Sequence, residues 1–154
     1  MAEPAHRPLV ERRVDAGRIT LPAPLRALLG DRVAVAADLA GCVLAARPEV
    51  LSDALQGLRR ASSRSHHATE LYRFLAGTEA LVEIDERGRL ALPRLHREWA
   101  GISPRGNALL LATGSGVQIW DPRRLDILLR VAHRHLRELH SHILREQFEL
   151  FGDG

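Results

Sequence analysis

The chain has 154 residues, a formal net charge of +3 and no lysine, so all 22 of its basic residues are arginines. A net charge this small is weak evidence for a nucleic-acid partner, so that argument has to rest on how the arginines cluster. Aromatic residues make up only 4% of the chain. This scarcity disfavours the base stacking used by single-strand and RNA-binding modules, and duplex DNA is the better nucleic-acid candidate.

The chain has one cysteine, Cys42, which excludes an internal disulfide and lies in an apolar run that would bury it. The amino-terminal segment is polar, and no run approaches the roughly 18 apolar residues of a membrane helix. We therefore expect a cytoplasmic protein with no membrane partner.

Two segments of the chain carry nearly the same sequence. Gly17–Pro22 (GRITLP) returns as Gly88–Pro93 (GRLALP), at an offset of 71 residues (88 − 17). Val43–Pro48 matches Val117–Pro122 at an offset of 74 (117 − 43). The second copy thus has about three extra residues, which we place near 103–105 in a loop that tolerates insertion. Each copy is too small to bury a stable core alone, so an intramolecular pseudo-dimer is expected.

In each copy the glycine–arginine corner leads into a short strand, predicted at 19–21 and at 90–92. The proline that follows starts a helical turn, because its fixed φ and missing N–H suit the first turn of a helix. These turn helices are predicted at about 24–29 and 93–100. Gly30 and Gly101 would end them, since glycine readily adopts the left-handed conformation of a helix cap.

Paired apolar runs come next and predict a β-hairpin in each copy. The first pair is 33–37 with 42–46, and the second is 108–112 with 117–120. Helices are expected to begin again at Pro48 and Pro122. Between the copies, the polar segment 59–67 and a short helix at 68–76 form a connector.

The C-terminal segment has apolar residues at intervals of four and three, which would form a single seam along a helix. The seam spans about three heptads, which favours a helix docked on its own subunit or on a neighbour over a free coiled coil. His135, Glu138 and His142 share one helical face and could bind a metal, but such pairs are common on exposed helices, so we predict no cofactor. The seam consists of Leu125, Leu129, Ala132, Leu136, Leu139, Ile143 and Leu150.

The second copy contains Ile84–Pro93 (IDERGRLALP), then Trp99–Gly101 (WAG) and Gln118–Pro122 (QIWDP). Together with the repeat, these motifs resemble the MraZ family, bacterial regulators of the division and cell-wall gene cluster. The resemblance implies an α+β fold: two tandem AbrB/SpoVT-like swapped-hairpin modules in an intramolecular pseudo-dimer, with a long C-terminal helix. We expect the modules at 8–63 and 79–124, a helical connector at 64–78 and the C-terminal helix at 125–150.

The family's motif is an aspartate, three arbitrary residues and an arginine. Asp85 and Arg89 match it, with Gly88 between them, whereas Asp15 in the first copy is one residue closer to its arginine, Arg18. The resemblance implies that the first copy faces DNA and that members form ring-shaped homo-oligomers. A ring presents the same face repeatedly, so direct repeats about 10 base pairs apart are the expected target.

The predicted DNA contact is an arginine projected by a glycine corner, because a guanidinium can meet a guanine edge or a phosphate. We predict Arg18 in this role, with Asp15 and Gly17 as structural parts of the corner. The alternative is that Arg18 only pairs with Asp15 and pins the turn. Nearby arginines would add phosphate contacts; they are Arg12, Arg13 and Arg26.

In the second copy the neighbouring acids Glu79, Glu83 and Glu86 would repel phosphate. Asp85, Gly88 and Arg89 are therefore predicted to be a structural motif held by an ion pair.

The resulting hypothesis is a nucleoid-associated, non-enzymatic transcriptional regulator, and the family resemblance implies that it represses its own division and cell-wall promoter. Its partners would be double-stranded DNA and copies of itself, with no small-molecule substrate. The sequence contains no nucleophile elbow, zinc-protease helix or nucleotide fingerprint. Two alternatives stay open: an oligomeric scaffold that has lost DNA recognition, and a metal-dependent enzyme that uses the C-terminal histidines.

Overall fold

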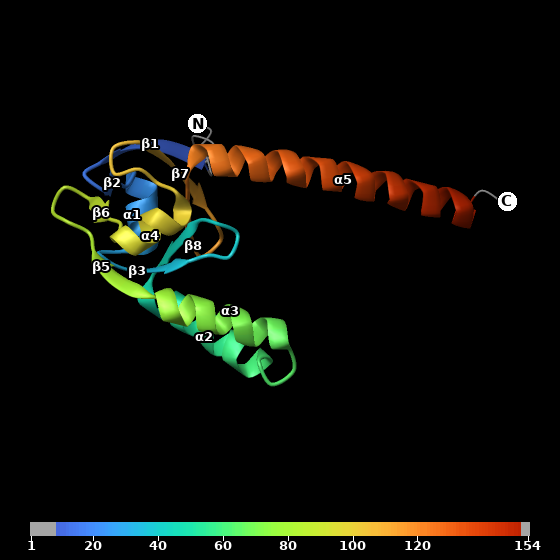
Figure 1. The fold of residues 1–154 in the computed structure, drawn as a ribbon, viewed down its shortest axis with the longest axis horizontal. Coiled ribbons are helices and arrows are strands. Elements are labelled where there is room, and N and C mark those ends of the chain that lie inside the picture. Colours follow the sequence, from blue (N-terminus) through green and yellow to red (C-terminus); the bar gives the residue numbers. More distant parts are fainter. Residues whose placement is uncertain (1–8, 152–154) are drawn as a thin grey trace, which may run out of the picture. The chain divides into compact units, whose positions relative to one another are not determined.

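The computed structural model describes the backbone of residues 9–151 and the side chains of residues 9–142. The chain divides into two compact units, Met1–Pro122 and Arg123–Gly154. The first unit combines an antiparallel sheet with four helices, and the second consists of one long helix, α5 (Pro122–Phe151) (Figure 1). None of the helices described is both long and apolar enough to cross a membrane.

The sheet of the first unit has eight strands in the order β5-β3-β4-β8-β7-β1-β2-β6, and every pairing is antiparallel. A bridge between Ile84 and Leu90 brings the two ends of this order together, so the sheet is close to a barrel. The strands are β1 (Leu9–Asp15), β2 (Arg18–Thr20), β3 (Arg32–Ala37), β4 (Val43–Ala46), β5 (Ala80–Glu83), β6 (Arg89–Ala91), β7 (Asn107–Ala112) and β8 (Gly116–Trp120).

Pairs of neighbouring strands from the two sequence copies alternate in this sheet: β3 and β4 of the first copy lie beside β8 and β7 of the second, which lie beside β1 and β2 of the first. β1 of the first copy pairs with β7 of the second, while β5, the counterpart of β1, pairs with β3 of the first. Where the copies meet, equivalent residues stand opposite each other: Ile19 pairs with Leu90, and Leu44 pairs with Gln118. The predicted fold is thereby confirmed as tandem swapped-hairpin modules joined in an intramolecular pseudo-dimer.

One apolar core serves both copies. Ile19, Leu29, Leu90, Leu110 and Ile119 are fully buried and belong to the same cluster. Neither copy can assemble this cluster alone, because each supplies only part of the residues that exclude water from it.

Two short helices, α1 (Ala23–Leu29) and α4 (Arg94–Ala100), follow the glycine corners as predicted from the Leu-Pro steps. The strands before them begin one residue earlier than predicted, at Arg18 and Arg89. Each arginine is the first residue of the β2–β6 ladder, in which Arg18 pairs with Ala91 and Arg89 pairs with Thr20. Reciprocal hydrogen bonds continue beyond the ladder. The N–H of Leu21 donates to the Gly88 carbonyl oxygen at 2.9 Å, and the N–H of Leu92 donates to that of Gly17 at 3.0 Å, outside the β2–β6 ladder.

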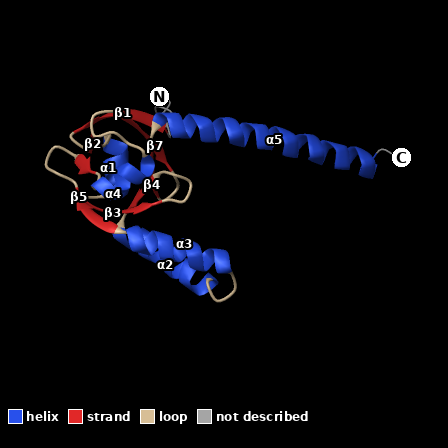
Figure 2. Cartoon of the chain, viewed as in Figure 1, coloured by secondary structure: helices blue, strands red, loops and turns tan. Residues whose placement is uncertain are grey.

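The connector is more helical than the sequence predicts. α2 (Pro48–Ala61) continues into the polar segment, and α3 (His66–Thr78) begins where the Ser65 side chain accepts a hydrogen bond from the N–H of Ala68. Serine-rich sequence looks like a loop, but here one serine caps a helix. α2 and α3 lie side by side as a helical hairpin (Figure 2), and Leu51 and Leu55 of α2 share an apolar cluster with Leu75 of α3.

Candidate nucleic-acid interface

The first glycine corner is a two-residue turn between β1 and β2. Ala16 and Gly17, its central residues, have φ angles of 49° and 77°, and Asp15 pairs directly with Arg18. Positive φ at both central residues is the signature of a type I′ hairpin turn, whose twist matches that of the strands. The first motif has one residue fewer between its aspartate and its arginine than the family's motif. This shorter spacing leaves a two-residue hairpin turn, and Arg18 is the first residue after it.

Ala16 is the only non-glycine residue with positive φ in the part of the chain that the structure describes. An alanine in the left-handed region costs about 1 kcal/mol, whereas asparagine tolerates it. Ala16→Asn is expected to raise the melting temperature by about 2–4 °C in a calorimetric scan. Ala16→Val should lower it, because a β-branched residue fits this φ poorly. A lower melting temperature for Ala16→Asn would contradict the assigned turn.

The second corner is a longer, capped loop. Asp85 Oδ1 accepts hydrogen bonds from the backbone N–H groups of Arg87 and Arg89, each at 2.9 Å, and Asp85 Oδ2 accepts one from Arg89 Nε at 2.8 Å. These contacts lower the pKa of Asp85 from its ordinary value of 3.8, and the backbone N–H of Arg89 is the largest cause. Arg89 is therefore held by the aspartate of its own motif.

The lowered pKa of Asp85 predicts how this loop responds to acid. The stabilisation from the carboxylate is fully present above the ordinary value of 3.8 and is lost as the pH falls through the lower folded value. Asp85→Asn should therefore be less stable than wild type in urea unfolding near pH 7, and the difference should shrink as the pH falls below 3.8. Asp53→Asn, which removes an exposed carboxylate of α2 with no ion pair in the described region, is the control and should show no such trend.

Each glycine corner is braced by an arginine from the other copy. A Cβ atom placed on Gly17 would lie 3.0 Å from Arg97 Nε, and one placed on Gly88 would lie 2.9 Å from Arg26 Nη1. Glycine is needed at both corners because φ is positive and these side chains cross closely. Arg26 thus lies against the second corner, although the sequence places it with the arginines of the first.

The arginines of β1 and β2 divide between two faces of the sheet. Val14 and Ile19 point into the core, so Arg13, Asp15 and Arg18 point outward and are exposed. Arg12 alternates onto the side of Val14, is half-buried, and donates from Nη1 to the Glu11 carbonyl oxygen at 3.0 Å. The expected cluster of four arginines is therefore not a single group, and only Arg13 and Arg18 share the outer face of the corner.

Asp15 does not hold Arg18 as Asp85 holds Arg89. The two residues are paired in register, but among the described residues no ion pair joins their side chains. The exposed Arg18 guanidinium is thus available at the turn, in contrast to its counterpart in the second copy.

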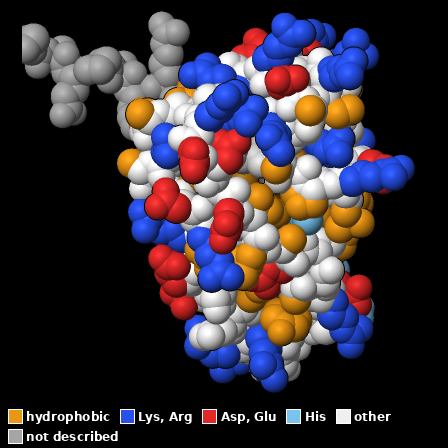
Figure 3. Space-filling view, turned by 90° about the vertical axis from the view of Figure 1, so that its left-hand side faces the viewer, with side chains coloured by type: hydrophobic (Ala, Val, Ile, Leu, Met, Phe, Trp, Pro, Cys, Tyr) orange, Lys and Arg blue, Asp and Glu red, His pale blue; other side chains and the backbone are white. Residues whose placement is uncertain are grey.

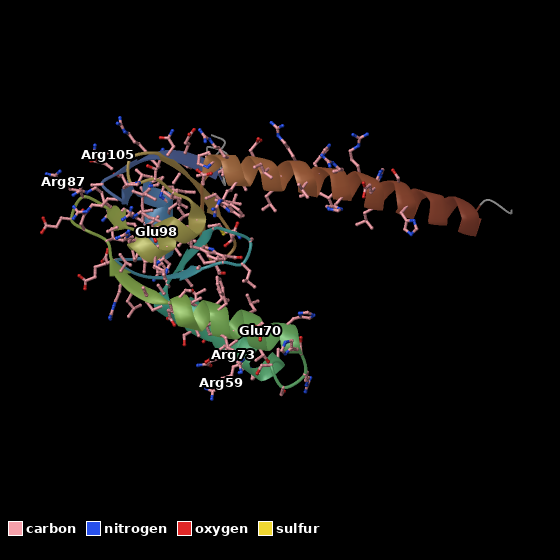
Figure 4. All side chains as sticks on the ribbon, in the orientation of Figure 1. Arg59, Glu70, Arg73, Arg87, Glu98 and Arg105 are labelled. Atoms are coloured by element: carbon pink, nitrogen blue, oxygen red, sulfur yellow. The ribbon has the colours of Figure 1, made fainter. Side chains whose placement is uncertain are left out.

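A further arginine, Arg105, is brought to the first corner by the inserted loop of the second copy. The carbonyl oxygens that flank it accept hydrogen bonds from the corner, Pro104 O from Gly17 N–H at 3.0 Å and Gly106 O from Val14 N–H at 2.8 Å. Figure 4 shows Arg105 and Arg87 projecting outward from the barrel near its glycine corners. In Figure 3, which views this side of the molecule, arginine side chains crowd the upper part, with carboxylates interspersed. The sequence marks Arg105 as part of an insertion but does not indicate that it lies beside the first glycine corner.

The histidines of α5 do not assemble a metal site in the described region. No group of three histidine, cysteine or acidic side chains there could hold a metal ion. His135 Nδ1 lies 3.9 Å from Glu138 Oε2, which is an exposed pair within one helix.

Comparison with known proteins agrees with the fold and the motifs. The chain is 35% identical over 115 residues to the transcriptional regulator MraZ of Symbiobacterium thermophilum, covering 72% of this chain and 80% of that protein. It is 29% identical over 109 residues to the MraZ of Acetivibrio thermocellus, covering 70% and 75% of the two chains. It is 30% identical over 118 residues to the MraZ of Oleidesulfovibrio alaskensis, covering 73% and 77%.

No protein-family model matches the chain. The sequence identity to these relatives extends over more than two thirds of both sequences. The chain also has the repeated glycine corners and the strands exchanged between its two copies. From its sequence relatives and its fold, the chain belongs to the MraZ family of transcriptional regulators.

Proposed function

We propose that the chain regulates transcription by binding double-stranded DNA through the outer face of its first glycine corner. The observation that carries this proposal is the difference between the two corners. Arg89 Nε donates to Asp85 Oδ2 at 2.8 Å, whereas Arg18 is exposed and its side chain forms no ion pair with Asp15 in the described region. An exposed guanidinium on a rigid hairpin can meet a guanine edge with two hydrogen bonds or straddle a phosphate.

The neighbouring arginines supply the charge that a single contact lacks. Arg13 shares the outer face with Arg18, and Arg105 lies on the loop bonded to the corner. Arg12 is turned to the other face of β1, and Arg26 lies against Gly88 at the second corner. On this proposal both would contribute phosphate contacts at the edge of the interface. A few phosphate contacts per copy give weak, salt-sensitive binding, so several copies have to act together.

A ring of copies would meet this requirement. Cyclic symmetry presents the same corner in the same orientation from each copy, so the operator would consist of direct repeats about 10 base pairs apart. Linked sites raise the effective concentration for each further contact. On this proposal the protein is associated with the nucleoid and represses the division and cell-wall genes downstream of its own promoter.

The test is a titration of the full chain against the DNA upstream of its own gene, with a shuffled duplex of the same length as control. At about 50 and 200 mM salt, binding should be tighter for the upstream DNA and should weaken steeply with salt. Deleting one repeat should lower affinity. Equal binding to both duplexes, or none, would contradict the proposal and favour an oligomeric scaffold.

A further inference from the structure

Helix α5 presents an unusual amount of apolar surface. Of the eleven large hydrophobic residues that are most exposed in the described region, six lie on this helix. Leu129, Leu136 and Leu139 belong to the seam predicted from the sequence, and Leu136 is 63% exposed. Contiguous apolar surface of this kind marks a contact with another molecule.

The internal repeat indicates what kind of element covers such a seam. At the offset of 74 residues, α2 is the counterpart of the first half of α5, and Leu55 is the counterpart of Leu129. Leu55 is 8% exposed because α3 packs against α2, whereas Leu129 is 55% exposed. No counterpart of α3 follows α5 among the described residues. In the first copy an antiparallel helix covers the seam, and no helix of the described residues takes that place in the second copy.

We propose that the missing partner is α5 of a second copy of this chain, packed antiparallel on the seam. With the pair centred near residue 134, Leu129 packs against Leu139 of the second copy and Ala132 packs against Leu136 of the second copy. The two-fold symmetry repeats both layers. This arrangement buries the exposed leucines of both chains and leaves the arginines of the opposite helix face in water.

Charge favours the antiparallel direction. The residues flanking the seam are Asp126, His133 and His140 on one side and Leu128, His135 and His142 on the other. In the antiparallel pair Asp126 meets His140 of the second copy, and the contact occurs twice, while His133 and His135 each meet the same residue of the second copy. Within the described residues, the ion pair of Asp126 is with Arg130 of its own helix, at 3.1 Å and in an exposed position, which contributes little stability. In a parallel pair His135 would meet His140 of the second copy, and Asp126 would have no histidine of the second copy opposite it.

The contact is isologous, so it differs from the head-to-tail contact that a ring requires. It would join copies, or two rings, through their C-terminal helices. It does not rest on DNA binding, and every measurement below is made without DNA.

The first test compares two equally exposed apolar residues of α5. Leu136 lies in the seam and Ile127 on the opposite face, and each is 63% exposed. Leu136→Glu is expected to halve the mass measured by sedimentation equilibrium, while Ile127→Glu keeps the wild-type mass. Circular dichroism of each variant verifies that the helix persists. A wild-type mass for Leu136→Glu overturns the proposal.

The second test determines direction by disulfide formation between two variants that each carry one added cysteine, Leu129→Cys and Leu139→Cys. The native Cys42 does not compete, because it is fully buried and burial raises its pKa to about 12. In the antiparallel pair the two engineered positions meet only between different variants, since like positions lie about 15 Å apart along the axis. Each variant alone should remain monomeric on non-reducing gels, and a mixture should give a cross-linked dimer. Cross-linking within one variant, or none in the mixture, overturns the proposal.

Discussion

Arg18→Ala is expected to weaken binding to the upstream DNA by about 1–3 kcal/mol, or roughly 5- to 150-fold. On the proposed function, the exposed guanidinium next to the type I′ turn would supply DNA contacts that alanine cannot replace. If the contact includes one phosphate, the slope of log affinity against log salt should also fall by about one. Fluorescence anisotropy with a labelled duplex, at several salt concentrations, measures both quantities.

The matched control is Arg64→Ala, which removes the same charge from an exposed position between α2 and α3. This variant should bind DNA almost as wild type does. Equal losses for the two variants would show that only net charge matters, and no loss for Arg18→Ala would exclude the first corner as the DNA contact. Thermal unfolding of both variants separates a binding defect from a folding defect.

Gly116→Ala is expected to destabilise the protein by about 3 kcal/mol, because it places a methyl group where the two copies join. A Cβ on Gly116 would lie 2.7 Å from the backbone oxygen of Ala45 and 3.3 Å from the Cβ of Ala46. Gly116 pairs with Ala46 in the β4–β8 ladder, so neither strand can move away without breaking that ladder. Overpacking of a rigid site typically costs 1–3 kcal/mol.

Gly114→Ala is the control for this prediction, since a Cβ at Gly114 meets no atom within 4 Å. Urea unfolding of the two variants should give a large loss of stability for Gly116→Ala and little change for Gly114→Ala. Similar losses for the two would mean that the effect arises from the turn and not from the join between copies.

The repeated corners and the Leu-Pro steps are local signals, and they predicted correctly where the short helices begin. Proline and glycine act through backbone geometry that depends on a few neighbouring residues. The extent of α2 and α3 was less predictable, because a serine-rich stretch is compatible with both a loop and a capped helix, and packing of Leu55 on Leu75 favours the helix.

The candidate site was predicted only in part. The offset between Asp15 and Arg18 identified a departure from the motif, but not that the shorter spacing makes a two-residue turn that leaves Arg18 without an ion pair to Asp15. Strand alternation separates Arg12 from Arg13, and a pattern of clustered arginines does not show this until the neighbouring Val14 is known to be buried. Arg105 could not be found, since its proximity to the corner depends on hydrogen bonds between segments about 90 residues apart.

The sequence by itself determined the two-copy architecture, the family and the position of the glycine corners, because internal repeats and turn residues can be recognised from short stretches of sequence. Tertiary structure alone decided which arginines share a face, that Arg26 and Arg97 brace each other's modules, and that Leu129 stays exposed where Leu55 is covered. These features depend on strand exchange between the copies and on which helix packs against which. Such contacts join residues far apart in the chain, and local preference does not encode them.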